Sequence, residues 1–128
     1  MKDEQTETNI EAVQKTLQHV VEGKLDEALG TFETDSPKWN VAQGLPEAGL
    51  HEGADAIKKM LGAVRERYSG GYKLVHLTVH GTRDHVFAEY TRSPSTDENA
   101  EGAEHCLTVF EMAMGKIREA RDFVHRRS

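Results

Sequence analysis

The fold is decided by the C-terminal stretch Glu104–Ala113 (EHCLTVFEMA), Met114-Gly115-Lys116 (MGK) and Ile117–His125 (IREARDFVH). Both long flanks are rich in β-branched, aromatic and leucine residues, and apolar and polar side chains roughly alternate along each. The short insert between them contains a glycine. This pattern predicts two long antiparallel strands joined by a tight hairpin.

Three amphipathic helices are predicted upstream of the hairpin, because apolar residues recur there at helical spacing. Glycines are natural ends for the first and third helices, at Gly23 and Gly70-Gly71. Residues 1–8 are predicted to be a flexible tail, so that Thr8 or Asn9 caps the first helix. The apolar positions are Ile10, Val13, Leu17, Val20 and Val21, then Leu25, Ala28, Leu29 and Phe32, then Ala56, Ile57, Met60, Leu61, Val64 and Tyr68.

The remaining segments predict two more long strands and two loops. Residues 34–53 contain prolines and glycines, which indicates a loop with a short edge strand at Lys38–Val41. Tyr72–His80 and His85–Arg92 alternate as strands do. In the first of these, alternation predicts Leu74, His76, Thr78 and His80 on one face, and Val75, Leu77 and Val79 on the other.

The order of elements predicts a single α+β domain over residues 1–128. Four antiparallel strands follow three helices, and the polar loop Ser93–Gly102 (SPSTDENAEG), expected to be mobile, interrupts the strands. Helices that cover one face of a long, twisted sheet leave the sheet curved around them. We therefore expect a cone-shaped curved antiparallel sheet, wrapped by three N-terminal helices, with a cavity inside.

Composition restricts the class of protein. The chain is 37% hydrophobic and 30% charged, which suits one soluble domain. The net charge of −6 argues against nucleic-acid binding, because phosphates are bound by clustered Lys and Arg. No apolar run approaches the length of about 20 residues that spans a membrane, and the N-terminus lacks the apolar part of a secretory signal. A cytoplasmic protein with no nucleic-acid or membrane partner is expected.

The cysteine and the histidines do not predict a metal site. Cys106 is the only cysteine, and a buried, inert thiol is expected there. His76 and His80 share a predicted strand face but lie about 13 Å apart, whereas one zinc ion needs nitrogen ligands at about 2.0–2.1 Å. Neither a metal nor an organic cofactor is therefore expected.

Three segments carry a resemblance that extends over about the whole chain. They are the N-terminal helix pair ending in Ala28-Leu29 and Phe32, the segment Leu50–Ile57 with a glycine before the third helix, and the hairpin with Val109-Phe110-Glu111, Gly115-Lys116-Ile117 and Arg121-Asp122-Phe123. The chain resembles the nuclear transport factor two-like superfamily, which includes ketosteroid isomerases, SnoaL-type polyketide cyclases and limonene-epoxide hydrolases. The resemblance implies a cavity for a small hydrophobic molecule, and a cofactor-independent isomerase or cyclase of SnoaL or ketosteroid isomerase type.

Within that superfamily, the limonene-epoxide hydrolases give a finer comparison. Arg121-Asp122-Phe123 is similar to their Arg-Asp-Tyr, in which the Asp is a catalytic carboxylate, and Asn40 resembles their water-positioning Asn. The hydrolases also carry an Arg and an Asp two residues apart on one strand, where this chain has Tyr90 and Arg92. The carboxylate is therefore missing unless Glu89 replaces it, and strand alternation is expected to point Glu89 to the opposite face. An epoxide-hydrolase-like enzyme would therefore have an altered triad.

The candidate catalytic residues are Asp122, Tyr90 and Arg92. Asp122 would act as an acid or a base, with Tyr90 and Arg92 beside a developing oxyanion. Two alternatives remain: a structural salt bridge of Asp122 with Arg121, Arg92 or Arg118, and simple packing of Tyr90 and Arg92 on the sheet.

The candidate ligand-binding residues are Trp39, Asn40 and His105. Trp39 suits the wall of an apolar pocket and equally suits a core plug. Non-catalytic alternatives are a ligand-binding module with the same cavity, and a protein-interaction module whose cavity is filled by side chains.

A homodimer is predicted from the apolar pattern of the hairpin. Cys106, Phe110 and Met112 face one way, whereas Leu107 and Val109 face the other. The helices can cover only one of these faces. Large exposed apolar patches are rare on monomers, so a second copy is expected on the other face.

Overall fold

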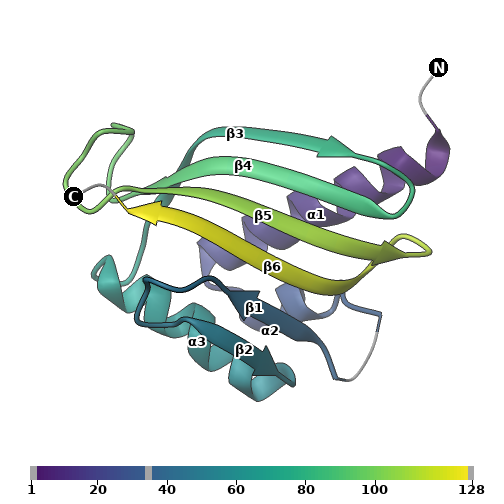
Figure 1. The fold of residues 1–128 in the computed structure, drawn as a ribbon, viewed down its shortest axis with the longest axis horizontal. Coiled ribbons are helices and arrows are strands. Elements are labelled where there is room, and N and C mark those ends of the chain that lie inside the picture. The colour runs from purple at the N-terminus through teal and green to yellow at the C-terminus, as the bar shows by residue number, and fades with distance from the viewer. Residues whose placement is uncertain (1–2, 34–35, 127–128) are drawn as a thin grey trace.

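The computed structural model describes residues 3–33 and 36–126, with side chains up to Val124. Three helices lie on one face of a single six-stranded sheet (Figure 1). This α+β architecture confirms the predicted fold class. The helices are α1 (Glu4–Glu22), α2 (Leu25–Leu29) and α3 (Ala54–Arg67).

The sheet has the strand order β2-β1-β6-β5-β4-β3, and all neighbours are antiparallel except β1 and β6, which are parallel. The predicted edge strand β1 is therefore an internal strand, because β2 pairs along its outer side. β2 was not predicted, since its four residues include a glycine and show little apolar pattern. The strands are β1 (Lys38–Val41), β2 (Gly49–Glu52), β3 (Lys73–Gly81), β4 (His85–Ser93), β5 (Glu104–Ala113) and β6 (Lys116–Arg126).

The predicted hairpin of β5 and β6 is confirmed. Its turn is Met114 and Gly115, whose φ angles of 50° and 82° are both positive, as a two-residue type I′ turn requires. A bulge in β6 follows the turn, between the pairs Glu111–Glu119 and Met112–Ile117. From Ala120 onward the strand alternates regularly, so Ala120 and Asp122 both face the helices.

Helix α1 begins earlier than predicted. Asp3 caps it by accepting a hydrogen bond from the Gln5 backbone N at 3.2 Å, so residues 4–8 are helical and not a tail. Residues 1 and 2 of the predicted tail lie outside the described residues. Asn9 is not a cap but a fully buried side chain, whose Nδ2 donates to the carbonyls of Thr82 and Arg83 at 3.3 and 3.0 Å. These bonds join α1 to the turn between β3 and β4.

The predicted alternation of β3 is wrong beyond its middle. The register with β4 shifts between Val75 and Thr78, at His76, whose φ is 55°. This β-bulge inserts one residue and exchanges the two faces of the strand. As a result Leu74 and Val79, predicted on opposite faces, both pack against the core.

The core lies between the inner face of the sheet and the helices (Figure 1). Its largest fully buried apolar side chains are Phe110, Ile57, Ile117, Val13 and Val86. In the part of the chain that the structure describes, no helix has the length and apolar character to cross a membrane.

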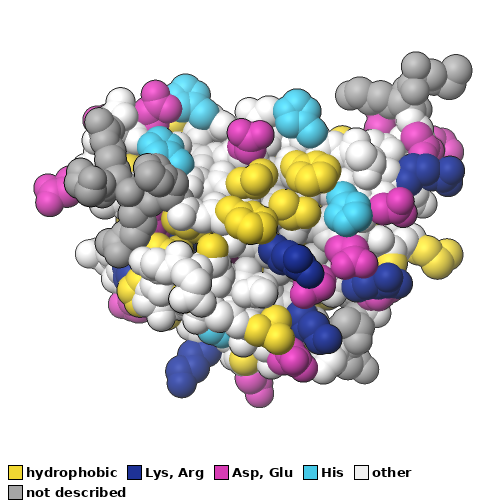
Figure 2. All heavy atoms as spheres, viewed as in Figure 1, with side chains coloured by type: hydrophobic (Ala, Val, Ile, Leu, Met, Phe, Trp, Pro, Cys, Tyr) yellow, Lys and Arg dark blue, Asp and Glu magenta, His cyan; other side chains and the backbone are white. Residues whose placement is uncertain are grey.

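The outer face of the sheet carries an apolar patch that the helices do not cover (Figure 2). The register aligns Phe87 with Val109, and Leu107 with Phe123, on this face. Phe87 and Phe123 are 36% and 51% exposed. We call these four residues the outer patch.

Candidate functional site

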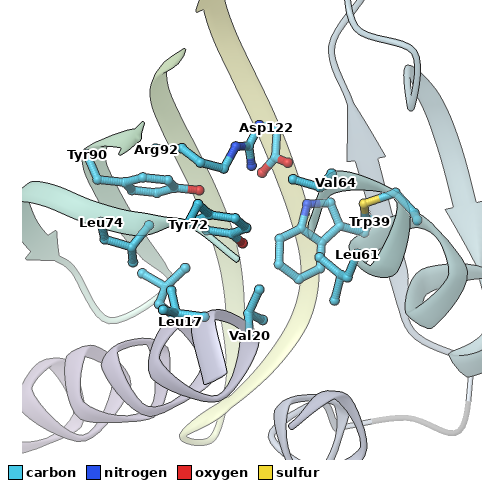
Figure 3. A pocket seen from close by; sticks show the side chains of 12 residues that line it. Leu17, Val20, Trp39, Leu61, Val64, Tyr72, Leu74, Tyr90, Arg92 and Asp122 are labelled. Carbon is cyan, nitrogen blue, oxygen red and sulfur yellow. The ribbon is translucent and has the colours of Figure 1, made fainter. Parts of the chain in front are cut away.

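A small pocket lies between the inner face of the sheet, α1 and α3 (Figure 3). The two helices contribute only apolar side chains, and the sheet side contributes the polar ones. Its volume is about 10 Å³, on the order of one water molecule, because the side chains pack closely around it. The lining residues are Leu17, Val20, Val21, Met60, Leu61 and Val64 from the helices, and Trp39, Tyr72, Leu74, Tyr90, Arg92 and Asp122 from the sheet side.

Four of the six candidate residues come together in this pocket: Trp39, Tyr90, Arg92 and Asp122. They come from three strands, β1, β4 and β6, whose side chains at these positions point toward the helices (Figure 3). Trp39 and Asp122 are brought close by the parallel pairing of β1 with β6, in which Trp39 pairs with Ala120. Trp39 also contacts two other core rings, with centroids 6.2 Å from Phe32 and 5.9 Å from Phe110.

Asn40 and His105 do not line this pocket. Asn40 follows Trp39 on β1 and is exposed, because neighbouring strand residues point to opposite faces. The placement does not agree with a water-positioning role for Asn40 beside Asp122. His105 also points away from the helices, and its Nδ1 lies 2.9 Å from the hydroxyl of Thr91. Glu89 is exposed on the same outer side, as alternation predicts.

Asp122 is a buried carboxyl, 7% exposed, in largely apolar surroundings. Thr108 Oγ1 donates to its Oδ1 at 2.9 Å. Burial raises the pKa of Asp122 above its ordinary value, and this effect outweighs the opposing influence of Arg92, Thr108, Trp39 and His51. None of the ion pairs in the described part of the chain includes Asp122, so the structural salt bridge considered from the sequence is not observed there.

Tyr90 is joined to Asp122 through Thr108. The Tyr90 and Thr108 hydroxyl oxygens lie 3.0 Å apart, and either can be the donor. Burial raises the pKa of Tyr90 well above its ordinary value, so the phenol stays protonated at neutral pH. Thr108 was missed from the sequence. The available signal was its place on β5, where it alternates with the apolar inward residues Cys106 and Phe110.

Arg92 is held by Glu104 and not by Asp122. Its Nε and Nη2 donate to Glu104 Oε1 at 3.0 and 2.8 Å, and its guanidinium lies 5.6 Å from the centre of the Tyr72 ring. Glu104 also accepts from Arg67 Nη1 at 2.9 Å and from the Tyr68 hydroxyl at 3.0 Å. Burial opposes ionisation of Glu104, but the hydrogen bonds and charges of Arg67 and Arg92 keep its pKa below the ordinary value.

A second glutamate completes this ion-pair cluster. Glu47, in the segment between β1 and β2, accepts from Arg67 Nε at 2.9 Å and from Nη2 at 2.8 Å. The cluster therefore contains two carboxylates and two guanidinium groups, which balance in charge. It borders the pocket through Arg92 and joins the β1–β2 segment, the end of α3, β4 and β5.

Among the residues that the structure describes, one polar atom lining the pocket has no hydrogen-bond partner. Trp39 Nε1 is buried and makes no hydrogen bond of ordinary geometry, although it is near enough to lower the pKa of Asp122. An indole N–H is only a donor, so it suits an acceptor oxygen in the pocket. The orientation is visible in Figure 3, where the Trp39 nitrogen lies on the Asp122 side of the ring.

Cys106 is a buried thiol on the inner face of β5. Its Sγ donates to the Glu104 carbonyl at 3.5 Å, and burial raises its pKa to about 12. Such a thiol is not a nucleophile at neutral pH. Among the residues that the structure describes, no three His, Cys, Asp or Glu side chains are arranged to hold one metal ion.

No protein-family model and no curated protein matches this chain. Solved structures do match. Bal32a from a soil-derived mobile gene cassette has a TM-score of 0.80 at 22% identity and covers 94% of this chain and 92% of its own. TerC, co-crystallized with polyporic acid, has a TM-score of 0.75 at 20% identity and covers 92% of both chains.

An NTF2-like protein from Anabaena variabilis ATCC 29413 gives a TM-score of 0.76 at 16% identity, with 99% of this chain and 96% of its own covered. The chain therefore has the nuclear transport factor two-like fold, as its sequence predicted. A putative isomerase from Bacillus subtilis also matches, with a TM-score of 0.68 at 17% identity over 93% of this chain and 87% of its own.

Proposed function

We propose that this protein binds a small, largely apolar molecule between the sheet and the helices α1 and α3, and transfers a proton to or from it without a cofactor. Asp122 is the acid or base, and Tyr90 and Arg92 are its electrostatic partners. The observation that carries this proposal is the convergence of Asp122 and Tyr90, both buried and joined through Thr108, on a pocket whose helix side is apolar.

The raised pKa of Asp122 supports a reactive role for this carboxyl. Perturbed pKa values are common at functional sites, and the pKa of Asp122 is raised chiefly by burial. A raised pKa brings an Asp nearer to neutral pH, where general acid–base catalysis is most effective. TerC, which was co-crystallized with polyporic acid, has the same fold.

Ligand entry requires the pocket to widen. Ligand pockets are usually about 300–1,000 Å³, far more than the 10 Å³ found here. The helix side of the pocket consists of apolar side chains that can change rotamer without breaking a hydrogen bond. Met60 is the most adaptable of them, since its side chain is unbranched and flexible. We expect the ligand to displace these side chains and α3 to adjust.

Binding is tested through Trp39, the only tryptophan of the chain. Cyclic ketones of one to four rings are titrated into the protein while tryptophan fluorescence is recorded. Because Trp39 lines the pocket, a bound ketone should change its emission, and the change should saturate. Asp122→Asn should weaken or abolish the saturable change, whereas Glu89→Gln, exposed on the outer face of β4, should leave it intact.

Proton transfer is tested with the same ketones in D₂O. Incorporation of deuterium next to the carbonyl is followed by mass spectrometry. We expect wild-type protein to accelerate the exchange and Asp122→Asn to lose on the order of 100-fold or more of that acceleration, the usual contribution of general acid–base catalysis. Equal exchange by wild type, Asp122→Asn and Glu89→Gln would contradict a catalytic role.

A second candidate is a protein-interaction module that binds no small molecule, and the closely packed pocket favours it. A protein-interaction domain needs no ligand space, and the available volume fits about one water molecule. This candidate predicts no saturable fluorescence change with any ketone and no deuterium exchange. The two experiments therefore separate it from the enzyme.

A further inference from the structure

Three polar groups form a single row beside the pocket. The Tyr90 and Thr108 hydroxyl oxygens are 3.0 Å apart, and Thr108 Oγ1 lies 2.9 Å from Asp122 Oδ1. Thr108 is fully buried, so no solvent competes for its hydroxyl. A hydroxyl has one proton, and therefore Thr108 can donate to only one of its two neighbours at a time.

The direction of donation along the row depends on Asp122. An ionised Asp122 can only accept, so Thr108 donates to it and Tyr90 must donate to Thr108. The Tyr90 oxygen then offers only lone pairs to the pocket. After Asp122 takes one proton from solvent, its O–H can donate to Thr108, and Thr108 can donate to Tyr90. The Tyr90 proton is then free to donate into the pocket.

We propose that Thr108 is a positioning residue that reverses this row of hydrogen bonds when Asp122 gains a proton, and so converts Tyr90 from an acceptor into a donor toward the pocket. If the proposed function holds, the protonated state accepts a ligand with a carbonyl or ether oxygen, with uptake of one proton. The ionised state accepts a ligand hydroxyl instead. The unpartnered Trp39 N–H adds a second donor for the oxygen-bearing ligand.

The other ionisable groups around Asp122 do not account for a change in the direction of these hydrogen bonds. Arg92 from β4 stays charged, and burial raises the pKa values of Tyr72, which precedes β3, and of Cys106 from β5. The pocket-lining side chains of α1 and α3 are all apolar. The remaining ionisable neighbour is His51 from β2, whose Nε2 lies 2.7 Å from the Glu47 carbonyl oxygen. The variant His51→Gln removes this ionisable group from the measurement.

The experiment uses the protein without ligand. ¹³C NMR follows the Asp122 carboxyl carbon and the Tyr90 Cζ carbon through a pH titration, in wild type and in His51→Gln. We expect both carbons to shift with the same midpoint. Asp122→Asn should remove the transition from Tyr90. Thr108→Ser, which keeps the hydroxyl, should preserve the common midpoint and the size of the Tyr90 shift.

Thr108→Val is the decisive variant, because it keeps the shape and removes the hydroxyl. The Asp122 midpoint should rise, since the carboxylate loses a donor, and the Tyr90 shift at that midpoint should fall to a small through-space remnant. A Tyr90 shift of wild-type size in Thr108→Val would overturn the proposal, as would a Tyr90 carbon that does not respond to Asp122 in wild type. Thr108→Ala serves if the valine variant does not fold.

This result is independent of turnover. If the row reverses in the ligand-free protein but no ketone binds, the proposed function fails and the positioning role of Thr108 stands. If ketones bind and exchange deuterium but the Tyr90 carbon does not respond to Asp122, the proposed function stands and the positioning role of Thr108 fails.

Discussion

Arg92 and Asp122 line the same pocket, but Arg92 donates both of its short hydrogen bonds, at 3.0 and 2.8 Å, to Glu104. The guanidinium is thus neutralised by a different carboxylate. Among the described residues, the side-chain hydrogen bond that Asp122 accepts comes from a neutral hydroxyl, that of Thr108. Glu104 has a lowered pKa despite its burial, because of Arg67 and Arg92, whereas burial raises the pKa of Asp122.

Asp122→Asn should retain the fold and gain stability relative to wild type as the pH rises. Burial raises the pKa of Asp122, so the folded protein holds this proton to a higher pH than the unfolded chain does. The stability contributed by the protonated carboxyl is fully present below pH 3.8, the ordinary pKa of an aspartate, and is lost as the pH rises through the pKa of Asp122 in the folded protein. The asparagine variant has no such loss. Its gain in unfolding free energy over wild type should reach about 1.4 kcal/mol for each pH unit by which folding raises the pKa of Asp122.

Urea denaturation of both proteins at several pH values measures this difference. Glu89→Gln, an exposed change on the outer face, should show no comparable trend. A loss of several kcal/mol for Asp122→Asn at every pH would instead identify Asp122 as part of a buried structural pair.

Glu104→Gln should be strongly destabilising. The Glu104 side chain is 1% exposed and pairs with Arg67 and Arg92, so the neutral amide leaves a buried guanidinium without its counter-charge. Breaking such a pair costs about 3–5 kcal/mol of unfolding free energy. Urea denaturation at neutral pH checks the value, with Glu66→Gln on the exposed side of α3 as the control. A loss no larger than that of the control would show that the cluster does not hold the fold.

The protein should be a homodimer that associates through the outer patch. Phe87 and Phe123 lie on a sheet face that no helix covers, and burying them against a second copy removes apolar area from water. Light scattering at micromolar concentration should give a dimer for wild type and a monomer for Phe123→Glu. Met114→Glu, at the 96% exposed hairpin tip, should remain dimeric. A wild-type monomer would end this prediction.

The middle of the loop Ser93–Gly102 should be dispensable, whereas its two ends should not. Residues 94–97 are exposed, and the His76–Glu98 ion pair at 3.4 Å joins two well-exposed side chains, which contribute little. Ser93 is fully buried, and the Gly102 carbonyl accepts from the Tyr68 hydroxyl at 2.8 Å. The Ser93 hydroxyl donates to the Asp97 carbonyl at 2.7 Å, so a replacement must keep an acceptor there. Replacing residues 95–100 with a tight turn that presents a carbonyl to Ser93 should change the free energy of unfolding by less than about 1 kcal/mol.

Thermal and urea unfolding measure the effect of that replacement. Tyr68→Phe, which removes the hydrogen bonds to Gly102 and Glu104 and keeps the ring, is the contrasting variant and should cost more than the loop replacement. A large loss from the loop replacement would mean that its middle packs on the sheet.

The sequence by itself determined the elements whose signals are local. The hairpin turn at Met114-Gly115, the end of α1 at Gly23 and the helical pattern of α3 depend on residues close together in the chain. Alternation along one strand predicted the outward direction of Glu89, and it also accounts for the inward direction of Asp122, which shares a strand face with Ala120. These elements and the resemblance were sufficient to predict the fold.

Only the tertiary structure decided the contacts between distant segments. The bulge at His76 and the parallel pairing of β1 with β6 depend on the register between strands. The periodicity of a single strand carries no information on that register. The same is true of Thr108, which is an ordinary strand residue until the pairing of β5 with β4 and β6 places it between Tyr90 and Asp122. The pairing of strands also explains why Arg92 binds Glu104 and not Asp122, because the register of β4 with β5 places Arg92 directly opposite Glu104.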